Sequence, residues 1–261
     1  MKKLLSIFLI LVSCFALCGC GKKSQMTDLE RVLKRGKLVV GVRTDVKPFG
    51  FLGPDGYNYG FDVDLASHLS KSILNKYENA VEYVPVTLRN RISYLNSGKV
   101  DCLIATMSVT EKRGKLMDFS QPYHIAGQAI LVNSWSKITT LKELDNKYVI
   151  IVYGSTTETN IRNLLPRCKI VGYKTYDEAI HALKSGKADA LIADDTILLS
   201  YTYDDKSIKI LPGRYSVEPY AVAFRKGVQS EKLREYTNIF LDQYARTGKL
   251  AKLQQKWRIK Q

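Results

Sequence analysis

Apolar residues along the chain follow two alternating patterns, which predict strands and helices in turn. Phe61, Leu65, Leu69 and Ile73 recur every four residues and mark one face of a helix. Short apolar runs bounded by polar residues predict buried strands. The predicted strands are 37–42, 81–86, 102–107, 128–132, 148–152, 169–173, 188–193 and 219–224, and the further helices are 88–95, 157–165, 176–183, 231–244 and 250–257. This alternation predicts an α/β fold with mostly parallel sheets.

Small polar groups and one arginine follow the predicted strand 102–107. The apolar run ends in Thr106, Met107 and Ser108, so these residues reach the edge of the sheet where open α/β folds bind ligands. Arg113 comes about one turn later, and a guanidinium group matches a carboxylate with two parallel hydrogen bonds. The segment therefore predicts a site for a small anion; the alternative is a surface arginine on a solvated turn.

The composition fits a soluble globular protein with room for two domains. Of 261 residues, 45% are hydrophobic and 25% are charged. The formal net charge is +15, which suggests a nucleic-acid or membrane-surface partner. Lysine and arginine are spread along the chain, however, and we find no nucleic-acid-binding motif. We expect no nucleic-acid partner.

The first 19 residues have the pattern of a signal peptide. Lys2 and Lys3 precede an apolar segment, 4–17, that is too short for an ordinary membrane-spanning helix. The segment ends in Leu-Cys-Gly-Cys at 17–20, which resembles a bacterial lipobox and implies cleavage before Cys20 and lipid on its thiol. We expect residues 20–27 to tether the protein to the outer face of the cytoplasmic membrane, on the cell-surface or periplasmic side.

Cysteine and histidine give no sign of a metal site. Only Cys102 and Cys168 lie beyond Cys20, and we expect them to stay unpaired in separate parts of the fold. The three histidines are scattered over separate elements, and there is no CxxC motif after the signal segment. We predict neither a metal nor a cofactor.

Six segments occur in the order seen in family 3 extracellular solute-binding proteins. They are KLVVGVRTDVKPFGF (37–51), GFDVDLA (60–66), SGKVDCLIATMSVTEKR (97–113), DFSQPY (118–123), YGSTTET (153–159) and GKADALIADD (186–195). The chain resembles the amino-acid receptors of ABC importers. The resemblance implies a monomer with a two-lobed, periplasmic-binding-protein-like (type II) fold and a two-segment hinge. Lobe 1 would comprise 28–131 plus 223–261 and lobe 2 would comprise 132–222, with an amino acid as ligand and a permease as partner.

The same resemblance assigns roles to individual residues. Arg113 matches the arginine that binds the ligand α-carboxylate, and Thr106 (through its backbone) and Ser108 resemble positions that hold the α-carboxylate and α-ammonium from lobe 1. Thr156 lies at a predicted helix start in lobe 2, where free N–H groups favour an anion. Asp194 matches the aspartate that receives the α-ammonium. Thr156 and Asp194 could instead serve only as helix caps.

Two further arginines bear on specificity. Arg43 and Arg91 match positions that face the cleft in relatives, and with Arg113 they would place three guanidinium groups near the ligand. Such an excess of positive charge predicts a ligand with a second carboxylate, aspartate or glutamate, and the segments resemble most closely the members that bind these. The alternative is that Arg43 pairs with Asp45 or Asp62 and Arg91 with a surface acid. The pocket would then be neutral and suit glutamine or cystine.

Other assignments stay open. Phe49 or Phe51 could supply the aromatic contact to the ligand. A secreted cyclohexadienyl dehydratase shares this fold, but it needs a general acid over its substrate. Asp194 and Glu158 are the available acids, and no nucleophile has an adjacent base, so we expect no enzyme activity. A sensor or an adhesin is a third possibility.

Overall fold

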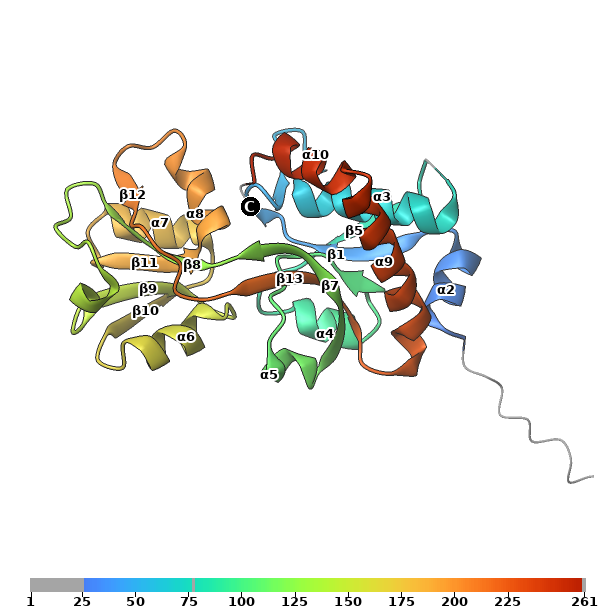
Figure 1. The fold of residues 1–261 in the computed structure, drawn as a ribbon, viewed down its shortest axis with the longest axis horizontal. Coiled ribbons are helices and arrows are strands. Elements are labelled where there is room, and N and C mark those ends of the chain that lie inside the picture. Colours follow the sequence, from blue (N-terminus) through green and yellow to red (C-terminus); the bar gives the residue numbers. More distant parts are fainter. Residues whose placement is uncertain (1–25, 77, 260–261) are drawn as a thin grey trace, which may run out of the picture.

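Two α/β lobes lie side by side in the computed structural model, which describes residues 26–76 and 78–259 (Figure 1). Each lobe contains one five-stranded sheet. The strand order is β5-β1-β6-β13-β7 in lobe 1 and β10-β9-β11-β8-β12 in lobe 2. The predicted signal peptide and Cys20 lie outside the described residues.

Lobe 1 combines segments from both ends of the chain. Its strands are β1 (Leu38–Val42), β5 (Val81–Pro85), β6 (Cys102–Leu103), β7 (Met117–Ala126) and β13 (Glu218–Arg225). Its helices are α2 (Asp28–Arg35), α3 (Phe61–Leu74), α4 (Arg91–Asn96), α5 (Glu111–Gly114), α9 (Val228–Arg246) and α10 (Lys249–Lys256). A small antiparallel sheet of β2 (Asp45–Val46), β3 (Gly50–Leu52) and β4 (Asn58–Tyr59) completes it.

Lobe 2 is built from the middle of the chain. Its strands are β8 (Gln128–Asn133), β9 (Tyr148–Val152), β10 (Lys169–Tyr173), β11 (Ala190–Asp194) and β12 (Ile208–Ile210). Its helices are α6 (Thr157–Leu164), α7 (Tyr176–Lys184) and α8 (Asp195–Thr202), and a 3-10 turn covers Leu141–Leu144. The predicted α/β architecture in two lobes is confirmed.

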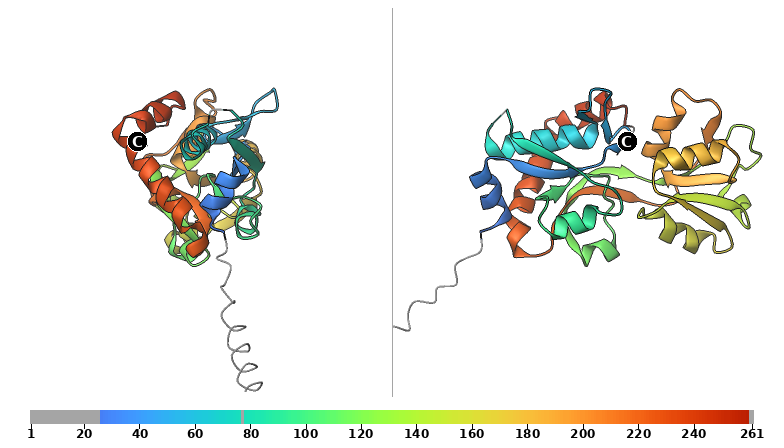
Figure 2. Two further views of the ribbon diagram at one scale, coloured as in Figure 1. Left: turned by 90° about the vertical axis from the view of Figure 1, so that its right-hand side faces the viewer. Right: turned by 180° about the vertical axis from the view of Figure 1, so that it is seen from behind.

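Two chain segments cross between the lobes, as Figure 2 shows from behind. One runs from β7 into β8, and the other returns from β12 to β13. In each sheet one crossing strand, β13 or β8, runs antiparallel to the other four. The expected lobe boundaries, at 131/132 and 222/223, fall inside β8 and β13. All of β8 belongs to the sheet of lobe 2, and all of β13 belongs to the sheet of lobe 1.

Two predicted elements have clearly different bounds in the structure, and one long strand has no predicted counterpart. The strand expected over 102–107 ends at Leu103, because the chain leaves the sheet and Thr106 adopts a left-handed conformation with φ of 47°. The helix expected over 88–95 begins at Arg91. Strand β7 was not predicted, because it contains Pro122 and has no clean alternation; its long pairing with β13 stabilises it.

Cys102 is buried in β6 of lobe 1, whereas Cys168 lies in lobe 2, and both are free thiols as predicted. Among residues 26–76 and 78–259, no helix has the length and apolar character to cross a membrane. Within the same ranges, no three side chains of His, Cys, Asp or Glu gather where they could hold a metal ion.

Candidate functional site

A cavity of about 540 Å³ lies between the lobes and brings together predicted site residues from both. Arg113 lines it from α5 of lobe 1, and Thr156 lines it from the residue before α6 of lobe 2. Glu218, at the start of crossing strand β13, lines it between them. The two lobes and the hinge therefore share one cavity.

Arg113 connects the two lobes directly. Thr110 caps the short helix α5 by accepting a hydrogen bond from the Arg113 backbone, which fixes where the side chain begins. The guanidinium donates to the Ser108 carbonyl at 2.8 Å and to the Gly154 carbonyl of lobe 2 at 3.3 Å. Burial lowers the pKa of Arg113, whereas the charges of Glu218 and Asp194 raise it. The charged guanidinium is thus held beside two carboxylates.

Asp194 ends strand β11 and faces the hinge. Its carboxylate accepts a hydrogen bond from the Tyr220 hydroxyl of β13. Burial, with the nearby charge of Glu218, raises the pKa of Asp194 to about 7. Its side chain makes no capping bond to α8; the Asp195 carboxylate instead accepts from the Thr196 N–H at 2.8 Å. Capping therefore does not explain the Asp194 side chain.

The Thr156 side chain bonds to the hinge strands and does not cap a helix. Its side chain makes no cap bond to α6. The hydroxyl donates to Glu218 at 2.8 Å and accepts from the Gln128 amide at 3.0 Å. Glu218 is only 2% exposed and also accepts from Gln128, Asn160 and Ser216. This network ties the beginning of α6 to both crossing strands.

The sequence patterns do not identify three residues of this site: Glu218, Gln128 and Tyr220. Glu218 is an acid at the head of a strand that is otherwise without charge until Arg225 at its end, and such a charge is a usable signal because buried carboxylates need partners. The role of Tyr220 depends on the register of β13 against β7, which the sequence does not show.

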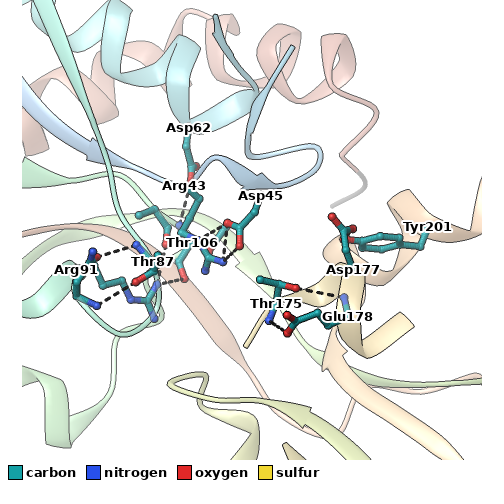
Figure 3. A network of polar contacts seen from close by, with 12 residues as sticks. Arg43, Asp45, Asp62, Thr87, Arg91, Thr106, Thr175, Asp177, Glu178 and Tyr201 are labelled. Atoms are coloured by element: carbon teal, nitrogen blue, oxygen red, sulfur yellow. Dashed lines mark hydrogen bonds and ion pairs between the residues drawn. The ribbon is translucent and has the colours of Figure 1, made fainter. Parts of the chain in front are cut away.

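Arg43 pairs with Asp45, as one of the two alternatives predicted. Its Nε and Nη2 donate to the two Asp45 carboxylate oxygens, each at 2.8 Å. The Arg43 side chain is 1% exposed, and its Nη1 has no hydrogen-bond partner among the described residues. Figure 3 shows this pair in lobe 1 opposite Asp177 and Tyr201 of lobe 2. Asp45, Asp177 and Tyr201 line a second cavity of about 450 Å³ between the lobes.

Arg91 is buried without an acidic partner among the described residues. Its Nη1 donates to the carbonyls of Ala105 and Thr106, and its Nε is buried without a partner (Figure 3). Burial lowers the pKa of Arg91, and the positive charges of Arg113 and Arg43 lower it further. Arg91 therefore lies within electrostatic range of the other two guanidinium groups.

Thr106 and Ser108 lie in the loop that leaves β6. The Thr106 N–H donates to the buried Asp62 carboxylate at 2.9 Å, and the Tyr123 hydroxyl donates to the same group. Burial raises the pKa of Asp62 to about 7. Ser108 is 3% exposed, and its carbonyl is occupied by Arg113. A left-handed threonine is strained, and such residues cluster at functional sites.

The two candidate phenylalanines lie in different places. Phe49 is fully buried, and its ring packs edge-on against Tyr220, with ring centroids 5.4 Å apart. Phe51 packs against Trp257 and lines the cavity of about 450 Å³. Phe49 thus supports the residue that binds Asp194, whereas Phe51 borders the Asp45 side.

Two α/β lobes with buried charged side chains converging between them define a two-lobed ligand-binding protein. The chain belongs to the bacterial extracellular solute-binding proteins of family 3, whose sequence profile matches residues 38–260. The predicted family is therefore confirmed.

Relatives extend the comparison over nearly the whole chain. The chain is 38% identical to the glutamine-binding protein of Geobacillus stearothermophilus, over 83% of this chain and 89% of that protein. It is 36% identical to the ABC transporter glutamine-binding protein GlnH of Bacillus subtilis (strain 168), over 98% of this chain and 97% of that protein. The structure of an ancestral arginine-binding protein bound to glutamine matches with a TM-score of 0.78 and 37% identity, over 87% of this chain and 99% of that one. These relatives are named as binding proteins, not enzymes.

Proposed function

We propose that this protein captures an amino acid between its lobes and delivers it to an ABC permease, with glutamine as the preferred ligand. Arg113 binds the ligand α-carboxylate, with Ser108 beside it, and Asp194 binds the α-ammonium. Thr156 contributes from lobe 2. Membership of the family and the convergence of these groups from both lobes support this assignment.

The observation that carries the choice of glutamine is the polar character around Arg43 and Arg91. Each has one buried N–H group without a partner among the described residues, so each can donate to a ligand oxygen. Asp45 adds a carboxylate that can accept. A side-chain amide has both an acceptor oxygen and two N–H donors, whereas an ionised carboxylate only accepts. The mixed set therefore suits an amide best.

The argument for an acidic ligand depended on uncompensated positive charge. Arg43 is compensated by Asp45, the charges of Glu218 and Asp194 act on Arg113, and Asp62 lies within electrostatic range of Arg91. Aspartate or glutamate stays a prediction that no comparison confirms, and its electrostatic basis is weaker than the sequence suggested. Glutamine-binding relatives favour the amide.

We infer a lipid anchor at Cys20, removal of residues 1–19 and a monomeric protein from the sequence pattern and the family alone. Mass spectrometry of the protein purified from membranes tests the anchor. A diacylglycerol mass on a chain that begins at Cys20 is expected, and a chain that still carries residues 1–19 would contradict it.

A ligand screen tests the proposed function. Residues 22–261 are heated with each standard amino acid and with cystine, because a ligand that binds only the folded state raises the melting temperature. The largest shift is expected with glutamine, followed by titration calorimetry. A shift with aspartate and glutamate alone would overturn the amide assignment, and no shift with any amino acid would overturn the transport role.

Asp45→Asn tests the charge balance around Arg43. Removing the paired carboxylate leaves the Arg43 charge uncompensated, so we expect the affinity ratio of glutamate to glutamine to rise on the order of tenfold. Calorimetric titration with both ligands measures the ratio. Asp55→Asn, at an exposed turn, is the matched control. An equal change for both ligands would show that Asp45 does not set the preference.

A further inference from the structure

A third cavity lies in lobe 1, among helices α3, α9 and α10. Its volume is about 560 Å³. None of its lining residues belongs to the interlobe cavities described above. The three helices pack side by side along lobe 1 (Figure 1). We call it the lysine groove, for Lys71 of α3 and Lys249, Lys252 and Lys256 of α10 that line it.

The positive charge of the lysine groove is largely uncompensated. No acidic residue lines it. Lys256 pairs with Asp64 at 2.7 Å, and the Trp257 indole also donates to that carboxylate. None of the ion pairs found within the described part of the chain involves Lys71, Lys249 or Lys252. Three lysines that take part in none of these ion pairs therefore line one groove.

The wall of the lysine groove is aromatic and apolar. The rings of Phe240 and Tyr244 stack with centroids 5.1 Å apart, and Leu253 is buried beside them. The Tyr244 hydroxyl lies 2.7 Å from Nδ1 of the half-buried His68. An occupant of this groove would thus meet positive charge and an apolar surface together.

Three of the lysines act electrostatically on one residue, His68. Burial lowers the pKa of His68, and the charges of Lys71, Lys256 and Lys249 lower it further, against the opposing effect of Asp64. Lysine is a compact point charge with three N–H donors, and it binds phosphate oxygens as a point charge. A groove with several lysines, no arginine and no acid favours an anion that can carry more than one charge.

We propose that the lysine groove binds a phosphate ester, with its phosphoryl oxygens between Lys71, Lys249 and Lys252 and its organic part against Phe240 and Tyr244. Two sources share this chemistry: a soluble phosphate ester and the headgroup of an anionic phospholipid. The inference does not depend on which amino acid the interlobe site binds.

His68 provides a local spectroscopic test. Glycerol 1-phosphate and vesicles of phosphatidylglycerol in phosphatidylcholine are the two probes, and vesicles of phosphatidylcholine alone are the blank. An anion in the groove offsets the lysine charges, so a bound ester should raise the pKa of His68, read from its NMR ring signal, by about 0.5 or more. His181, an exposed histidine of lobe 2, should not change. Equal shifts at His68 and His181 would overturn the proposal.

Charge-matched variants separate a site from general attraction. The groove variant carries Lys71→Gln, Lys249→Gln and Lys252→Gln, and the control carries Lys137→Gln, Lys142→Gln and Lys147→Gln on the exposed surface of lobe 2. Both lose three charges, so long-range attraction falls about equally. We expect the groove variant to bind at least about tenfold more weakly than the control.

The probes then identify the source. Binding of glycerol 1-phosphate supports a soluble ester, and binding of anionic vesicles alone supports a lipid headgroup. Equal losses in the two variants would show that only net charge matters, and binding of neither probe would overturn the site. Melting temperatures and glutamine binding of both variants verify that each is folded.

Discussion

Arg113→Ala is expected to weaken amino-acid binding by at least about a hundredfold. The guanidinium is buried, and truncation leaves the ligand carboxylate in the cavity without a partner, at a cost of roughly 3–5 kcal/mol. It also removes the donor to the Gly154 carbonyl, one of the hydrogen bonds between the lobes. Titration calorimetry with glutamine measures the loss.

Two further variants sharpen this prediction. Lys115→Ala removes an exposed positive charge at the C-cap of the same helix, outside the cavity lining, and should leave affinity within about twofold. Arg113→Lys keeps the charge but loses the paired geometry, so its affinity should lie between those of the parent and the alanine variant. Parent-like binding by Arg113→Ala would mean that the ligand carboxylate is held elsewhere.

Most of the strands could be predicted because their apolar runs are uninterrupted. The expected 148–152 and 169–173 coincide with β9 and β10; every residue of β9 after Tyr148 is buried, and every residue of β10 after Lys169 is partly buried. Strand β7 contains Pro122 and several polar residues, and it exists because it pairs with β13 about 100 residues later. Local pattern cannot reveal a strand whose stability comes from such a distant partner.

The candidate site likewise contains residues that local motifs reveal and residues that only the fold brings together. Thr156 and Arg113 lie within recognisable motifs, and the structure places both at one cavity. Glu218 meets Thr156 only because the chain returns through the hinge. Counting three arginines in the sequence overstated the positive charge, because the Asp45 partner of Arg43 was only one of several possible pairings. Net charge at a site depends on pairs, and pairs depend on the fold.

The contacts between the lobes suggest how ligand capture is coupled to closure. The Arg113 guanidinium reaches Gly154 just before α6, while Thr156 is held by Glu218 on β13. Arg113 and the crossing strand β13 therefore both contact the beginning of one helix in lobe 2. A ligand that engages Arg113 and lobe 2 together favours the closed arrangement by its difference in affinity for the two states.

Asp194→Asn is expected to abolish binding while stabilising the ligand-free protein. An amide cannot compensate the ligand ammonium, so affinity should fall by at least about a hundredfold. The parent should bind more weakly as pH falls below about 7, where Asp194 takes up a proton, and binding near pH 6 should release protons. Calorimetry in buffers of different ionisation enthalpy measures that release. Binding by Asp194→Asn with parent affinity would contradict the assignment.

The stability effect has a defined sign and pH window. The pKa of Asp194 is raised from 3.8 to about 7 in the folded protein, so the folded state binds more protons than the unfolded state between these values. Stability of the ligand-free parent therefore declines as pH rises from about 4 to 7. Asp194→Asn lacks this decline and should gain on the order of 1–3 kcal/mol at pH 8 and almost nothing at pH 4. Asp62 titrates in the same direction but is present in both proteins, so their difference reports Asp194. Denaturant unfolding at the two pH values, with the exposed Asp204→Asn as control, measures the gain. A loss of stability at pH 8 would mean that the Tyr220 hydrogen bond outweighs the burial of charge.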